Sequence, residues 1–112
     1  MINFCSFHKD GWIWTKLKDL PHPRCAHTVR IDTSTDLMHV FGGWDGKQLI
    51  YSDLLEYNLT THQWTDHIVL NPKPTKRFGH ACANAIEEGF LIFGGVNCNN
   101  DFKDLCLIFP KE

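Results

Sequence analysis

One short motif occurs twice in this sequence, and the distance between its two copies limits what the chain can fold into. Residues 38–43 read Met-His-Val-Phe-Gly-Gly, and residues 90–95 read Phe-Leu-Ile-Phe-Gly-Gly. Short apolar runs that end on glycines are typical of buried β-strands. Gly94 follows Gly42 by 52 residues, and self-similarity at such an interval indicates stacked or radially arranged units.

The residues around the two glycine pairs repeat as well. Arg77 and His80 follow Arg24 and His27 by 53 residues, and a second Asp-Leu pair follows the first, at Asp53, by 51 residues. This small drift is what single-residue deletions in loops produce. The two units are therefore in register.

Each unit of about 50 residues divides into four strand candidates, which in the first unit are residues 24–31, 38–43, 53–57 and 64–68. Helical periodicity is absent from the sequence. Four strands per unit is the pattern of a β-propeller blade. We therefore expect an all-β fold, a partial propeller of about two four-stranded antiparallel blades without significant helix.

The repeated positions resemble the kelch repeat. In the first unit they are Arg24, His27, Phe41, Gly42, Gly43, Asp53, Leu54, Tyr57 and Trp64. In the second they are Arg77, His80, Phe93, Gly94, Gly95, Asp104 and Leu105, with Ile108 where a Tyr is expected. The resemblance covers about residues 12–109 and implies a kelch-type propeller in which these positions are structural.

The units divide the chain into four segments if the strands of a blade are lettered a to d outward from the propeller axis. Residues 1–11 are an N-terminal segment without periodicity, and residues 12–17 are the outer d strand of a preceding blade. Residues 18–68 form kelch repeat 1, and residues 69–112 form kelch repeat 2 without its last strand.

Two blades are too few for a closed ring, because propellers have about four to eight. Three explanations remain open. The chain is a fragment of a longer kelch protein, or it associates with its own copies or other kelch blades, or it forms an open two-blade sheet. In the second case, the N-terminal d strand of one chain pairs with the a–c strands of a neighbour.

Large aromatic residues and glycines have expected structural roles in this scheme. Trp64 lies in an outer strand, where its ring can wedge between blades, and Trp14 is its expected counterpart 50 residues earlier. We expect Trp14, Trp64 and Tyr57 to be structural. The paired glycines allow positive φ and close approach where the chain leaves the crowded axis.

Charge and cysteine content narrow the class of protein. The chain has 11 basic and 13 acidic residues, a net charge of −2, and so lacks the basic balance of a nucleic-acid or membrane-surface binder. Its start lacks the pattern of a signal peptide. Five cysteines at irregular spacing fit reduced thiols better than a disulfide framework. We expect a cytoplasmic protein.

The sequence offers weak signals for catalysis or metal binding. Cys25 with His27, and His80 with Cys82, could each chelate a metal from one face of a strand. Both histidines are already explained as repeat positions, however, and the two cysteines are not equivalent. Motifs of hydrolases, phosphate loops and zinc proteases are absent. We expect no enzyme activity, no metal and no cofactor.

Loops on one face of the blades are the expected binding surface. If strand a runs away from the top face, the d-to-a and b-to-c loops lie on that face, at residues 44–50, 72–77 and 96–101. Trp44 is the best candidate anchor, because its counterpart is the much smaller Val96. The candidate partner-binding residues are Trp44, Asp45, Lys47, Gln48, Lys73, Lys76, Arg77, Asn97, Asn99, Asn100 and Asp101.

These observations predict a protein–protein interaction module. The kelch resemblance implies a scaffold or a substrate-recognition part that binds a protein through its loops. Two alternatives remain: part of a kelch-like propeller enzyme, or a truncated product without independent function.

Overall fold

The computed structural model describes residues 3–8, 11–85 and 89–109. In these ranges the chain is all-β, as expected, and contains no helix. The strands are β1 (Asn3–His8), β2 (Gly11–Lys16), β3 (Thr28–Asp32), β4 (Leu37–Phe41), β5 (Leu54–Asn58), β6 (Gln63–Ile68), β7 (Ala81–Asn84), β8 (Phe90–Phe93) and β9 (Leu105–Ile108). No helix that could cross a membrane occurs in the described ranges.

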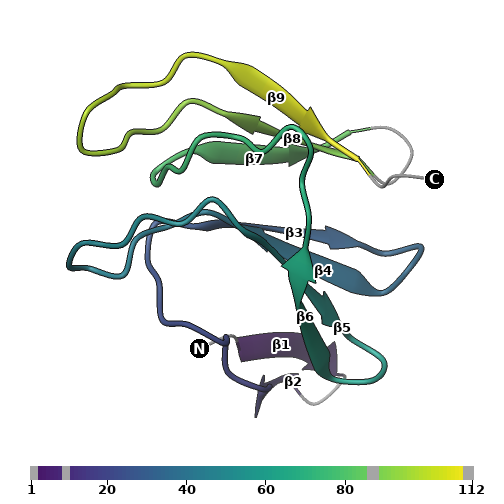
Figure 1. Cartoon of the computed structure of the whole chain (residues 1–112). Coiled ribbons are helices and arrows are strands. Elements are labelled where there is room, and N and C mark those ends of the chain that lie inside the picture. Colours follow the sequence, from purple (N-terminus) through teal and green to yellow (C-terminus); the bar gives the residue numbers. More distant parts are fainter. Residues whose placement is uncertain (1–2, 9–10, 86–88, 110–112) are drawn as a thin grey trace.

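The strands form three antiparallel sheets that lie one above another (Figure 1). The first blade is the four-stranded sheet β3-β4-β5-β6, and the second blade is the three-stranded sheet β7-β8-β9. Strands β1 and β2 form a separate hairpin. Within each blade the strands follow one another in chain order, as local hairpin connections favour.

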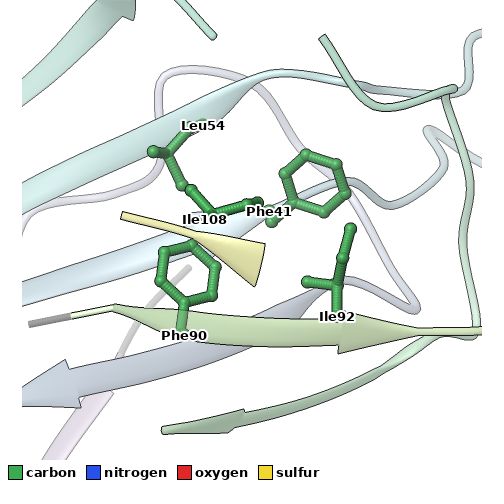
Figure 2. Close-up of a cluster of buried hydrophobic side chains, with 5 residues drawn as sticks. All are labelled: Phe41, Leu54, Phe90, Ile92 and Ile108. Carbon is green, nitrogen blue, oxygen red and sulfur yellow. The ribbon is translucent and has the colours of Figure 1, made fainter. Parts of the chain in front are cut away.

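The two blades pack through an apolar core built from facing strands. Phe41 and Leu54 come from the first blade. The second blade contributes Phe90, Ile92 and Ile108, and Figure 2 shows the five side chains gathered between the sheets. Burying an apolar side chain of this size stabilises the fold by about 1.5–3 kcal/mol. The expected stacking of successive units is therefore present.

Alternation along the strands produces a second cluster on the other face of the first blade. Val40 and Leu55 pack there with Leu20 and the half-buried Trp64. The Trp64 ring lies 4.8 Å from that of the buried Tyr57, centre to centre, and its indole N–H donates a hydrogen bond to the carbonyl of Lys18 at 3.4 Å. Trp64 and Tyr57 therefore pack against each other within the first blade.

Trp14 does not pack into a core within this chain. Its side chain is 67% exposed. Backbone pairing also places Trp12 opposite Phe7, as Trp64 lies opposite Tyr57. Trp12 therefore has the pairing position in the β1–β2 hairpin that Trp64 has in the β5–β6 hairpin.

A strand also replaces part of the expected irregular N-terminus. Residues 3–8 form β1 and pair with β2 along the full length of the hairpin. The sequence of this segment shows no clear alternation of apolar and polar residues, so the strand could not be predicted from it. The strand is defined instead by its backbone pairing with β2. The hairpin therefore supplies two strands where one was expected.

Candidate functional site

A buried arginine side chain ties the segment before β3 to both ends of the β4–β5 connection. The guanidinium of Arg24 donates two hydrogen bonds to the Asp53 carboxylate, at 2.7 and 3.0 Å, and one to the Gly42 carbonyl at 3.0 Å. It also stacks 3.9 Å above the ring of Tyr51. This bidentate arginine–carboxylate pair is a charge-assisted interaction with a defined geometry. It holds the end of β4 and the start of β5 in place.

The second blade repeats the same arrangement. Arg77 donates to the Asp104 carboxylate at 2.6 and 3.0 Å and to the Gly94 carbonyl at 3.1 Å, and it lies 4.2 Å above the ring of Phe102. Its hydrogen bonds lower the pKa of the Asp104 carboxyl. Arg77 is only 1% exposed. It therefore does not belong to a partner-binding surface, because burial and four internal contacts occupy its side chain.

The repeated histidine joins the two blades. The Nε2 atom of His80 lies 2.7 Å from the hydroxyl oxygen of Thr28 in the first blade, and its ring contacts the ring of Phe41 edge-on. Burial lowers the pKa of His80. His80 therefore takes part in the packing between blades.

Two equivalent loops shape the top face. The Asp45 carboxylate accepts hydrogen bonds from the backbone N–H groups of Lys47 and Leu49. The bond from Lys47 is the main cause that lowers the pKa of this carboxyl. Asn97 accepts in the same way from Asn99 and Asn100. Such side-chain-to-backbone bonds are the means by which Asp and Asn hold tight turns. The two loops are thus ordered by their own residues.

Contacts between blades hold these loops side by side. The ring of Trp44 stacks on that of Phe78, with centres 5.5 Å apart and planes inclined by 22°. The side-chain amide of Asn97 donates to the carbonyl of Lys76 at 3.2 Å. The β4–β5 and β8–β9 connections project from the same edge of the molecule, at the left of Figure 1. The top face is therefore a continuous surface, defined here by loops 44–50, 75–78 and 96–101.

The predicted binding residues occupy different places on this framework. Trp44 is half-buried and covers the neighbouring blade through Phe78. Exposed positions on the same loops are Lys47, Gln48, Lys76, Asn99, Asn100 and Asp101. Lys73 instead lines a hollow between β6 and β9 and is not part of the top face.

Sequence reasoning missed two residues of the top face. Phe78 provides the surface on which Trp44 stacks, and Leu49 is an exposed apolar side chain in the loop that carries Trp44. The signal for Phe78 is its position directly after the repeated arginine, as Trp44 directly follows the repeated glycines. The backbone of Phe78 also pairs with that of Val96, which is the counterpart of Trp44 in the second blade.

The described residues contain no group of three or more His, Cys, Asp or Glu side chains arranged to hold a metal ion. Cys25, Cys82, Cys98 and Cys106 are free thiols. Burial raises the pKa of the Cys82 thiol, which makes this residue less nucleophilic than an ordinary cysteine.

Comparison with known proteins places this arrangement in a family context. Residues 3–111 match the family described as the KLHDC2/KLHL20/DRC7 Kelch-repeats domain. Acyl-CoA-binding domain-containing protein 4 of Arabidopsis thaliana is 33% identical over 95 residues, which cover 82% of this chain and 14% of the relative. Kelch-like protein terF of Aspergillus terreus is 32% identical over 111 residues, covering 96% of this chain and 22% of the relative.

A shorter match has higher identity. Acyl-CoA-binding domain-containing protein 5 of Arabidopsis thaliana is 38% identical over 66 residues, which cover 59% of this chain and 10% of the relative. The chain thus spans between 10% and 22% of the length of these three proteins.

Proposed function

The chain belongs to the kelch-repeat family, and we propose that it binds a protein partner through its top face. Kelch-repeat domains generally bind proteins. The observation that supports the top face as the site is the joining of loops from two blades through Trp44 and Phe78. Loops held by a rigid scaffold are favourable places for recognition residues.

The surface chemistry suits a protein more than a small ligand. The exposed apolar side chain of Leu49 lies in the same loop as Trp44, whose ring stacks on Phe78, and exposed polar and charged side chains lie on the same loops. Aromatic residues at a centre with a polar rim are typical of protein interfaces. Lys47 and Asp101 give the rim both signs of charge, so the proposed partner offers a mixed surface with an apolar patch.

We propose binding rather than catalysis as the role of this chain. The repeated Arg, Asp and His side chains, which could otherwise suggest acid–base chemistry, are engaged in holding strands and blades together. We further propose that the protein works in the cytoplasm, since exposed thiols such as Cys25 and Cys98 are suited to a reducing compartment.

Affinity capture with the tagged chain tests the top face. We expect the double variant Lys47→Glu/Leu49→Ala to weaken binding of a captured partner by roughly tenfold or more, because it removes apolar area and reverses a rim charge. Trp44→Phe should retain stacking on Phe78 and give a smaller loss. The measurement is a titration with the identified partner.

Thr61→Glu is the matched control, because it changes an exposed residue in the β5–β6 turn at the opposite edge of the first blade. It should bind as the unmodified chain does. Full binding by the Lys47/Leu49 variant, together with loss on Thr61→Glu, would move the site to the opposite edge.

A further inference from the structure

A hollow of about 800 Å³ opens at the outer end of the junction between the two blades. Its apolar walls come from both blades and from the segment that connects them. They include Leu54, Ile68, Leu70, Phe90, Cys106 and Ile108. The hollow is continuous with the core between the blades, because all six of these residues also belong to that core or pack against it.

A tryptophan fills the corresponding place in the first blade. Trp64 packs there against Leu55 and contacts Tyr57. The counterparts of Leu55 and Tyr57, 51 residues later, are Cys106 and Ile108, and both line the hollow. The hollow therefore has the position and apolar character of a site for a tryptophan from a fourth strand.

The neighbouring edge of the second blade is open to such a strand. Among the described strands, β9 pairs only with β8, whereas its counterpart β5 pairs with both β4 and β6. An open edge presents backbone N–H and C=O groups that can bind another strand.

The hairpin at the other end of the molecule carries a strand with matching features. Trp12 and Trp14 project from the same face of β2, by strand alternation, and are 69% and 67% exposed. Ile13 lies on the other face and is also exposed. The sequence Trp-Thr, which begins at Trp14, occurs again at Trp64 in β6. Among the described strands, β2 pairs only with β1 and so has a second edge available.

We propose that β2 of one copy of this chain adds to the open edge of β9 in a second copy and inserts its tryptophans into the hollow. The strands run antiparallel, as β5 and β6 do. Trp12 then lies opposite Ile108, in the position that Trp64 takes opposite Tyr57. The same register sets Trp14 opposite Cys106.

This register also satisfies the outer face of the second blade. It brings Ile13 opposite Leu107, and both side chains are exposed in the single chain. Apolar residues therefore meet on both faces of the added strand, and the β1–β2 hairpin stays intact. Because donor and acceptor are different surfaces, the copies associate head to tail.

The molar mass of the chain in solution, measured by light scattering over a range of concentrations, tests this assembly. We expect a mass above the 12.9 kDa monomer that rises with concentration. The donor variant Trp12→Ser/Trp14→Ser should weaken association by roughly tenfold or more, because it removes both aromatic anchors. The acceptor variant Val69→Asp/Phe109→Asp should do the same by placing charge at exposed rim positions of the hollow.

Mixing the two variants distinguishes specific docking from general loss of fold. Each variant retains the surface that the other lacks, so an equimolar mixture should form a heterodimer of twice the monomer mass. Val29→Ala, which truncates an exposed apolar side chain of β3 outside the hollow and the top face, is the control and should assemble normally.

A folded chain that stays monomeric at every concentration would overturn the proposal. So would a donor variant that assembles like the unmodified chain, or a mixture that gives no heterodimer. Capture of a strand from a different protein at β9, by a chain that does not bind itself, would equally count against a second copy as the occupant. These outcomes are independent of partner binding at the top face, which involves other residues.

Discussion

At the scale of single residues, the repeated positions are explained by close contacts rather than by chemistry at a surface. Gly42 has a φ of +69°, and a Cβ atom there would lie 2.7 Å from the His80 ring and 2.8 Å from the Arg77 carbonyl. Gly94, its counterpart, meets only the Phe102 carbonyl at 3.5 Å. The difference arises because Gly42 is covered by residues of the following blade.

Substitution of Gly42 by alanine should therefore destabilise the chain more than the same change at Gly46. Both glycines have positive φ, but nothing lies within 4 Å of a Cβ at Gly46. Forcing extra atoms into a packed region costs about 1–3 kcal/mol, which should be the difference in the free energy of unfolding between Gly42→Ala and Gly46→Ala. Urea denaturation measures both, and equal losses would contradict the role of close packing.

At the scale of elements, equivalent strands differ in what covers them. The face of β4 that carries His39 and Phe41 looks toward the second blade, and His39 lies 2.9 Å from the Glu56 carboxylate in β5. The equivalent face of the second blade carries Leu91 and Leu107 at the positions of this polar pair. The two blades therefore have equivalent strands, but a polar pair in the first blade is replaced by an apolar pair in the second.

Phe41 and Phe93 allow a direct comparison of these two faces. They are 52 residues apart in equivalent strands, but Phe41 is 1% exposed and Phe93 is 52% exposed. Truncation of a fully buried phenylalanine costs about 3–5 kcal/mol, and we expect Phe41→Ala to fall in this range. Phe93→Ala should cost less than half as much.

Both variants are compared by urea unfolding at a concentration where the chain is monomeric. A loss at Phe93 as large as that at Phe41 would show that the outer face of the second blade is already covered within one chain.

At the scale of the whole molecule, the half-buried His27 and the buried His80 link stability to pH. Burial is the main cause that lowers the pKa of both His27 and His80 below the usual value of 6.5. The unfolded chain therefore takes up protons first as the pH falls below about 6.5. Stability is complete above this value and decreases as the pH falls through the lowered pKa values of the folded state.

We expect the urea concentration at the midpoint of unfolding to decrease when the pH is lowered from 7.5 to 5. Most carboxyl groups titrate below this pH range. The variant His27→Gln/His80→Gln should show a flatter dependence over the same range, even if it is less stable at pH 7.5. An equally steep decrease in the variant would assign the effect to other groups.

The repeat, most of its strands and the all-β fold can be predicted from the amino-acid sequence alone. The apolar runs, the 52-residue interval and the glycines that follow β4 and β8 are visible in the sequence without any knowledge of tertiary contacts. The structural roles of Tyr57 and Trp64 followed from their place in the repeat. The loops of the candidate site could also be identified, because turn residues such as Asp45 and Asn97 organise their own backbone.

The accessibility of these residues, in contrast, depends on how the segments pack in three dimensions. It buries Arg77, directs Lys73 to the hollow, stacks Trp44 on Phe78 and leaves Trp14 exposed. It also defines β1, whose strand depends on pairing with β2. The physical reason is that a sequence pattern shows which face of a strand is apolar, whereas burial depends on which neighbouring segment covers that face.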